Sequence, residues 1–373
     1  MRIYRRELLR QFGTAAASSV LFPSLAKSAF DRTDSSPGPV RLNRNESAYG
    51  PCEKAKVAFH EVFTEANRYP GEDVASLRVA VAAIHGVKPD NITLGCGSTE
   101  VLRMTAEACL GPGKNLVIAS PTFDSIASAA RLLGATVHNV PLTPDHAHDL
   151  NAMLARIDRT TGLLYICNPN NPTGTLTAKP DLEAFIPKVP AGVSVLIDEA
   201  YHDYVEPTGA YSSYAEHAPS DRRLIVTRTF SKVYGLAGLR VGYAVSSAET
   251  AERLAVRRVA MDLNVVAARV ALAALSDQAY VRKIAALNAN DRQEFFNQAN
   301  ARMLRTLDSH SNFVLMHVGR PGKEVADMLR ARGTLVASSY PLFERHIRVS
   351  LGLPEEMQAF WHAWDASMPH HPM

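Results

Sequence analysis

The region from about Asn91 to Ser247 constrains the fold most, because short apolar runs alternate there with stretches of helical spacing. This alternation is typical of a largely parallel sheet whose faces are covered by helices. Sheets of this kind bind ligands at the ends of their strands, and polar motifs follow the apolar runs of this region. We therefore predict an α/β fold with a ligand site along the strand ends.

The length and composition of the chain favour a large domain followed by a smaller one. The chain has 373 residues, of which 46% are hydrophobic, so it can bury a substantial core. Residues 248–307 have helical spacing and are predicted to link the two domains. Strand-like runs at 312–316 and 346–350, with a helix-like segment at 324–332 between them, predict a small α+β domain.

A lysine motif follows the apolar run at 224–227, which is typical of a buried strand. Thr229 and Ser231 precede Lys232, and Arg240 follows it. Burial and neighbouring cations make a lysine amine nucleophilic, so that it can hold an aldehyde cofactor as a Schiff base. Hydroxyl groups and a guanidinium can hold the phosphate of such a cofactor. A solvated surface lysine is the alternative, and the neighbouring motifs decide against it.

Three other runs in this region end in polar motifs. Ile166–Gly174 ends in a turn that contains Asn171, whose amide can donate a hydrogen bond. The run Val193–Tyr201 indicates a buried strand that delivers Asp198 at its end, and a buried carboxylate is costly unless it meets a cation or donors. Residues 91–100 indicate a strand, a glycine-rich turn and a helix start with Ser98 as a possible N-cap, which is a common anion site.

Together, and in this order, the motifs resemble those of the fold-type I pyridoxal-phosphate aminotransferases of class I/II, in particular the histidinol-phosphate aminotransferase branch. The resemblance implies a mostly parallel large-domain sheet between helices, with pyridoxal 5'-phosphate as cofactor. It implies that Lys232 is the catalytic residue, that Asp198 keeps the cofactor ring protonated, and that Tyr201 lies beside Asn171 at its phenolic oxygen. The other implied cofactor contacts are Gly97, Ser98, Thr99, Thr229, Ser231 and Arg240 at the phosphate and Phe123 on the ring face.

The resemblance also implies a second subunit and a substrate site. Tyr69 matches the tyrosine that reaches the partner's cofactor phosphate, so we expect a homodimer with shared active sites. Arg348 matches the arginine that binds the substrate carboxylate, a group that fits a planar guanidinium. Tyr49 lies in the N-terminal loop that covers the family's active site, and we expect it to contact substrate. Ordinary packing of Tyr69 and Phe123, and a surface ion pair of Arg348, are the alternatives.

One departure from the family pattern bears on the substrate. Histidinol-phosphate aminotransferases carry a second arginine in a Gly-x-x-x-Arg segment that grips the substrate phosphate, whereas this chain has Ala337 four residues after Gly333. Loss of one charge-assisted contact costs about 1.5–3 kcal/mol. We therefore expect ping-pong transfer between an ordinary amino acid and a 2-oxo acid, and regard histidinol phosphate as a doubtful donor.

Two other functions remain open at this point. One is a pyridoxal-phosphate decarboxylase or lyase on the same scaffold, and the other is a periplasmic protein that binds the cofactor without catalysis. The net charge of +3 and the lack of a basic stripe argue against nucleic-acid binding. The scattered Cys52, Cys96, Cys109 and Cys167 predict free thiols and no metal site.

The N-terminus resembles a twin-arginine export signal. Arg5 and Arg6 precede a mildly apolar stretch from Phe12 to Leu25, with small residues before a cleavage point after Ala26 or Ala29. We therefore expect a periplasmic enzyme that meets the membrane only during export, with a cytoplasmic enzyme as the alternative. The expected parts are the export signal at 1–30, a spacer and N-terminal loop or helix at 31–66, a large cofactor-binding domain at 67–260 and a small C-terminal domain at 261–373.

Overall fold

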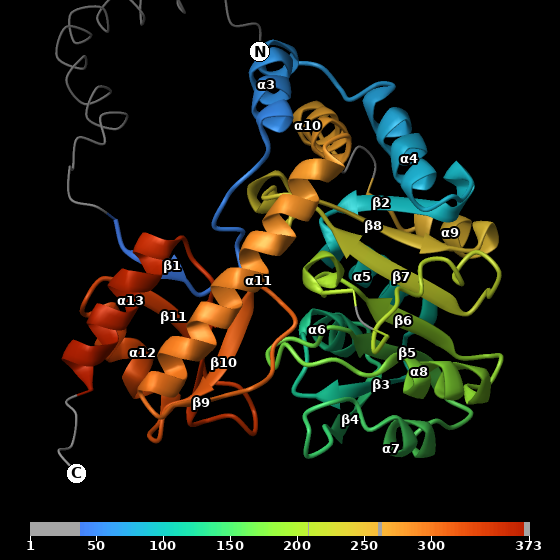
Figure 1. Ribbon diagram of the computed structural model, residues 1–373. Helices are drawn as coiled ribbons and strands as arrows, with labels where there is room; N and C mark the ends of the chain where they lie inside the picture. Colours follow the sequence, from blue (N-terminus) through green and yellow to red (C-terminus); the bar gives the residue numbers. More distant parts are fainter. Residues whose placement is uncertain (1–37, 208, 260–262, 369–373) are drawn as a thin grey trace, which may run out of the picture. The chain divides into compact units, whose positions relative to one another are not determined.

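The computed structural model describes residues 38–207, 209–259 and 263–368. From Val40 onward these residues belong to one compact unit (Figure 1). The predicted export signal lies outside the described residues. Among the helices of these ranges, none combines the length and apolar character that a bilayer span requires.

The larger sheet has seven strands, and all of them fall within the region where the sequence predicts alternating strands and helices. They are β2 (Ile92–Cys96), β3 (Asn115–Ser120), β4 (Thr136–Pro141), β5 (Thr161–Cys167), β6 (Ser194–Asp198), β7 (Leu224–Thr229) and β8 (Val241–Ser246). Their order is β2-β8-β7-β6-β5-β3-β4. The strands from β4 to β7 in this order pair in parallel, and β8 is antiparallel to both neighbours. The predicted largely parallel α/β sheet is confirmed.

Helices cover both faces of this sheet. They are α3 (Glu53–Val62), α4 (Asp73–Ile84), α5 (Ser98–Cys109), α6 (Ser125–Leu132), α7 (Leu150–Ala155), α8 (Lys179–Phe185), α9 (Ala248–Ala255) and α10 (Val265–Leu275). Successive residues of a strand point to opposite faces, so Leu163 and Tyr165 join the core under α5 and α6. Leu164 and Ile166 join the core on the other face, which includes α3, α4 and α10. Burial on both faces explains why β5 is apolar throughout.

A second sheet of five strands lies in the C-terminal part of the chain, apart from its first strand. The strands are β1 (Val40–Leu42), β9 (Arg305–Thr306), β10 (Phe313–His317), β11 (Thr334–Ser338) and β12 (His346–Ser350), in the order β1-β11-β12-β10-β9. Its helices are α11 (Gln278–Ala301), α12 (Gly322–Arg330) and α13 (Pro354–Ser367). The predicted α+β character of this part is confirmed, while the boundaries at 66/67 and 260/261 stay predictions.

The N-terminal segment does more than the expected spacer and loop, because β1 pairs in parallel with β11. A run of three residues is too short to show strand periodicity, so the sequence did not indicate it. This pairing ties residues 40–42 to the C-terminal sheet. The segment that follows, residues 43–46, thereby enters the cavity described below.

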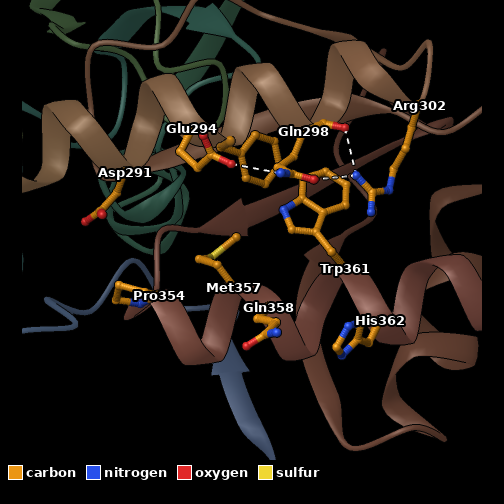
Figure 2. A pocket seen from close by; sticks show the side chains of 10 residues that line it. Asp291, Glu294, Gln298, Arg302, Pro354, Met357, Gln358, Trp361 and His362 are labelled. Carbon is orange, nitrogen blue, oxygen red and sulfur yellow. Dashed lines mark hydrogen bonds between the residues drawn. The ribbon is translucent and has the colours of Figure 1, made fainter.

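A separate groove of about 410 Å³ lies between α11 and α13 (Figure 2). Arg302 stacks on Trp361, with its Cζ 4.6 Å from the ring centroid, and its Nη1 donates to Gln298 Oε1 at 2.7 Å. Nη2 of Arg302 also pairs with Asp365 at 2.7 Å. These contacts fasten the two helices, and none of the predicted cofactor residues lines this groove.

Candidate active site

The ends of the central strands, the segment 43–46 and the loop after β11 enclose a cavity of about 1030 Å³. Most of the predicted site residues meet there although they are far apart in the sequence. Those that line it are Ser98, Thr99, Phe123, Asn171, Asp198, Tyr201, Thr229, Ser231, Lys232, Arg240 and Arg348.

One end of the cavity is a cluster of donors around the start of α5. The helix begins at Ser98 with Gly97 as its N-cap residue, at a φ of 74°. We expected Ser98 to be the N-cap, but it is the first helical residue. The chain turns through Gly97 in a conformation that favours glycine, so Gly97 takes the N-cap position. The first amides of a helix have no intrahelical partner, so those of Ser98 and Thr99 are available to an anion.

Arg240 reaches the same place from the turn before β8. Its Nη1 lies 3.3 Å from Ser231 Oγ and 3.0 Å from the carbonyl oxygen of Ala237. A Cβ atom on Gly97 would collide with the Arg240 guanidinium, and one on Gly242 would collide with the backbone of Ser98. Both glycines are thus needed for the helix start and the guanidinium to converge. Such a cradle of amides, hydroxyls and one cation fits a phosphate group.

Asp198, which also lines the cavity, is buried at the end of β6. Its Oδ2 accepts from the Tyr165 hydroxyl at 3.0 Å, and its Oδ1 accepts from the Ala200 amide at 3.1 Å. Burial raises the pKa of the Asp198 carboxyl above its ordinary value. No lysine, arginine or histidine forms an ion pair with it within residues 38–207, 209–259 and 263–368. A buried carboxylate without a cation fits a protonated ring nitrogen.

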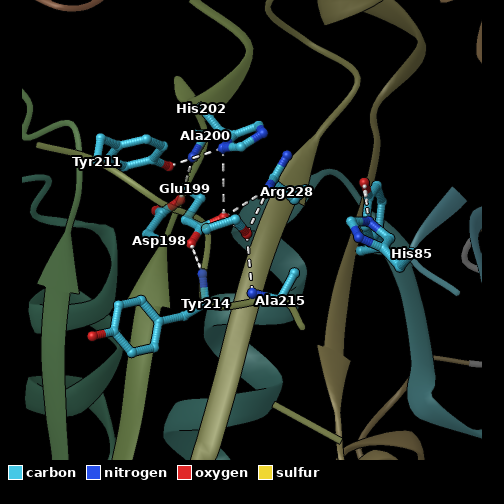
Figure 3. A network of polar contacts seen from close by, with 11 residues as sticks. His85, Asp198, Glu199, Ala200, His202, Tyr211, Tyr214, Ala215 and Arg228 are labelled. Atoms are coloured by element: carbon cyan, nitrogen blue, oxygen red, sulfur yellow. Dashed lines mark hydrogen bonds and ion pairs between the residues drawn. The ribbon is translucent and has the colours of Figure 1, made fainter. Parts of the chain in front are cut away.

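The next residue, Glu199, has its own cation (Figure 3). Its Oε2 accepts from Arg228 Nε at 2.8 Å and from Ser213 Oγ at 2.7 Å, and its Oε1 accepts from the Tyr214 amide. This buried pair joins the ends of β6 and β7, which carry Asp198 and Thr229. Sequence reasoning missed the pair, although both residues directly adjoin predicted site residues.

Tyr201 accepts two amide hydrogen bonds at its hydroxyl oxygen. Asn45 Nδ2 donates at 2.9 Å and Asn171 Nδ2 at 3.3 Å. Burial raises the pKa of Tyr201, so the phenol stays neutral. Because both lone pairs are engaged, its own O–H is left to donate to an acceptor in the cavity. Asn45 was not predicted, and a single asparagine in a loop offers no signal.

Lys232 is half-buried beside Tyr201. Its Nζ donates to the carbonyl oxygen of Asn45 at 2.9 Å and lies 5.4 Å from the Tyr201 ring centroid. Burial lowers the pKa of Lys232 from 10.5 to about 7, and the nearby positive charges of Arg348 and Arg240 act in the same direction. A substantial fraction of this amine is therefore neutral and nucleophilic at pH 7.

Arg348 lies on β12 at the other side of the cavity. Its Nη1 donates to Asn171 Oδ1 at 2.6 Å and its Nη2 to the carbonyl oxygen of Asn43 at 3.1 Å. Its Nε is buried without a partner. Ala337 of β11 is the direct cross-strand partner of Arg348, so a side chain at 337 lies beside the guanidinium. The position where the family has its second arginine holds only a methyl group.

Three predicted residues do not line this cavity. Gly97 contributes through its backbone, as described above. Tyr69 is 80% exposed. The hydroxyl of Tyr49 donates to Asp291 Oδ2 at 2.8 Å, and Tyr49 lines a different, small cavity. The contact of Tyr49 with substrate stays a prediction, since its hydroxyl is bound to Asp291 on α11 and it does not line the larger cavity.

The chain matches the family model described as aminotransferase class I and II over residues 37–363. It is 36% identical over 322 residues to a histidinol-phosphate aminotransferase of Moorella thermoacetica, and the match covers 86% of this chain and 83% of that protein. It is 39% identical over 330 residues to histidinol-phosphate aminotransferase 1 of Cupriavidus pinatubonensis, covering 87% of this chain and 86% of that protein.

Solved structures agree with this match. A putative histidinol-phosphate aminotransferase of Erwinia carotovora atroseptica has a TM-score of 0.83 and 31% identity, over 88% of this chain and 95% of that one. The histidinol-phosphate aminotransferase of Sinorhizobium meliloti, in complex with pyridoxal 5'-phosphate, has a TM-score of 0.82 and 28% identity, over 88% and 90%. Because the family model covers most of the described residues and the fold agrees, the chain belongs to the class I and II aminotransferases, enzymes that use pyridoxal 5'-phosphate.

Proposed function

We propose that this aminotransferase takes an α-amino acid as its amino donor and binds the donor's α-carboxylate at Arg348. The observation that carries the proposal is the guanidinium of Arg348, which stands beside Ala337 and keeps a buried Nε–H without a partner. Two of its five N–H donors serve Asn171 and Asn43, and the remainder match a carboxylate.

The residues around Lys232 would hold the cofactor in one orientation. Ser98, Thr99 and Arg240, with Thr229 and Ser231, would hold its phosphate. Asp198 would hold the proton on its ring nitrogen, Tyr201 and Asn171 would bond to its phenolic oxygen, and Phe123 would cover its ring. When bound, pyridoxal 5'-phosphate withdraws electrons from the substrate α-carbon. The amine of Lys232 would take the proton from that carbon as a base and deliver it as an acid to the 4′ carbon of the cofactor.

A second donor, histidinol phosphate, has two observations in its favour. The relatives named above act, by their names, on histidinol phosphate, and the exposed Arg44 also lines the cavity. No hydrogen bond or ion pair of its guanidinium occurs in the described part of the chain. Arg44 would be the cation that replaces the arginine missing at 337.

We also propose a homodimer in which Tyr69 completes the partner's phosphate site. Tyr69 is 80% exposed, and large apolar residues are exposed nearby in the sequence, with Phe63 at 64% and Phe59 at 39%. Exposed apolar side chains of this kind are typical of a surface that another chain covers. A hydroxyl that reaches across such an interface would add a donor to the cradle around Arg240.

Export through the twin-arginine route is a further proposal, and it rests on the sequence of residues 1–30. The Arg5-Arg6 pair and the small residues Ser24 and Ala26 support it. This route carries folded proteins, which suits an enzyme whose cofactor is loaded before export.

The lowered pKa of Lys232 predicts how the rate at which cofactor-free protein takes up pyridoxal 5'-phosphate depends on pH. The neutral amine is the reactive form, so the uptake rate rises with pH up to about 7 and then levels off. Stopped-flow absorbance between pH 5.5 and 10 would measure it. An ordinary lysine would keep gaining rate toward 10.5, and that profile would contradict the assigned environment.

The donor is tested by single-turnover titration of the holoenzyme with histidinol phosphate and with a panel of amino acids. We expect the cofactor to convert to its amino form with amino acids and only slowly with histidinol phosphate. Ala337→Arg should raise kcat/KM for histidinol phosphate roughly 10- to 150-fold, because it restores a charge-assisted contact. Lys232→Ala should abolish turnover and Asp198→Ala should slow it severely.

Other outcomes would replace the proposal. Rapid conversion by histidinol phosphate, lost in Arg44→Ala, would identify that donor and its cation. Release of carbon dioxide without the amino form would identify a decarboxylase. Normal rates in Lys232→Ala or Asp198→Ala would refute the assigned roles.

The shared site is tested with Tyr69→Phe, which should raise the dissociation constant of the cofactor roughly 10-fold through loss of one hydrogen bond to a charged group. In mixed dimers of Tyr69→Phe and Lys232→Ala subunits, one site should regain wild-type affinity, because it combines Lys232 of one chain with Tyr69 of the other. Light scattering gives the oligomeric state. A tyrosine acting within its own chain would leave every site impaired.

Export predicts a mature protein in the periplasm that begins after Ala26 or Ala29. Mass spectrometry of the fractionated full chain would show it. Replacing both Arg5 and Arg6 by Lys should hold the uncleaved chain in the cytoplasm, while Arg10→Lys, a matched change outside the pair, should not. An intact wild-type N-terminus in the cytoplasm would refute the proposal.

A further inference from the structure

The loop between β11 and β12, residues 339–345, is held in an unusual conformation next to the substrate end of the cavity. Ser339 and Leu342 both have left-handed backbone angles, with φ of 72° and 65°. Such angles are unfavourable for residues other than glycine, and they persist only where surrounding contacts impose them. Contacts with the rest of the protein therefore hold the loop in one conformation.

Phe343 supplies the contacts that impose it. Its side chain is only 5% exposed. Its ring centroid lies 5.3 Å from that of His146, in the segment before α7, and 4.9 Å from that of His346 at the start of β12. With Phe343 anchored from both sides, the preceding residues Tyr340 and Pro341 are placed on the cavity wall.

Tyr340 meets Arg348 there. The Cζ atom of Arg348 lies 5.5 Å from the centroid of the Tyr340 ring and 5.2 Å from that of Phe313. Aromatic faces at this distance attract a guanidinium and fix its plane. The remaining direct contacts, to Asn171 and Asn43, lie at the two terminal nitrogens. Ala337 adds no polar group. Tyr340 is the aromatic contact that the loop 339–345 contributes to Arg348.

We propose that Tyr340 is a positioning residue for Arg348 and that it makes this subsite selective for a carboxylate over a phosphate. The proposal deepens the proposed function and rests on it for the identity of the donor. A carboxylate is planar and can bind edge-on, in the plane of the guanidinium. A phosphate has oxygens outside that plane, where the electron-rich ring face of Tyr340 repels them and where Ala337 offers no second cation.

The test uses the holoenzyme and three variants at one position. Tyr340→Phe keeps the ring, Tyr340→Leu keeps the apolar volume without a ring, and Tyr340→Ala removes both. Leu342→Ala is the matched control, because Leu342 belongs to the same loop, is 63% exposed and does not line the cavity. The measurements are kcat and KM for the best amino acid donor, and the dissociation constants of acetate and of inorganic phosphate from spectral or competition titrations.

We expect Tyr340→Leu and Tyr340→Ala to raise KM and the acetate dissociation constant about 3- to 30-fold, the range of a partly desolvated cation–π contact. The kcat should stay within about twofold, and the dissociation constant of phosphate should change less than that of acetate, or fall. Tyr340→Phe and Leu342→Ala should behave as the wild type. Thermal unfolding of each variant confirms that it is folded.

Several results would overturn the proposal. Equal losses in Tyr340→Phe and Tyr340→Leu would mean that the hydroxyl and not the ring acts. If the dissociation constants of acetate and phosphate rise equally, or if only kcat falls, Tyr340 does not make the subsite selective for a carboxylate. If the wild type converts no amino acid, the proposed function fails, while the acetate and phosphate constants still decide the role of Tyr340.

Discussion

Two consecutive buried carboxylates at the end of β6 are the constraint around which the active site is arranged. Glu199 is neutralised within the chain by Arg228, which is itself buried on β7. Asp198 accepts from the Tyr165 hydroxyl and the Ala200 amide, has no ion-pair partner in the described part of the chain, and has its pKa raised by burial. The fold thus compensates one charge within the chain and leaves the other without an ion-pair partner among the described residues, as the proposed contact with the protonated cofactor ring requires. A carboxylate left in this state destabilises the empty protein and stabilises the protein that has bound its cofactor.

Much of this arrangement could be predicted, because parallel strands end at one edge of their sheet. The motifs that follow the runs ending at Cys167, Asp198 and Thr229 meet in one cavity for that reason. Residues such as Lys232 and Arg240 can be identified from the sequence, because their proposed chemical roles require one particular residue type. The period of the apolar runs then supplies the sheet.

What could not be predicted depends on contacts between distant segments. β1 is too short to show a pattern, and it forms only because β11 offers an edge. Asn45 forms hydrogen bonds to Tyr201 and Ser350, and no feature of the sequence around Asn45 predicts them. The bond of the Tyr49 hydroxyl to Asp291, 242 residues away, could not be predicted from the residues around Tyr49. Ser98 was predicted as the N-cap because the neighbouring residues do not indicate the backbone conformation that Gly97 adopts.

The position of Asn45 has a consequence for how the enzyme is made. Its backbone carbonyl accepts from Lys232, its side chain donates to Tyr201, and its amide donates to Ser350 Oγ at 2.8 Å. The strand before it, β1, pairs with β11. Residues 40–45 therefore cannot take their place beside Lys232 until β11 and β12 have left the ribosome. Contacts of such long sequence separation form late and slowly. The cavity around Lys232 is therefore completed only when β11 and β12 are available to hold residues 40–45.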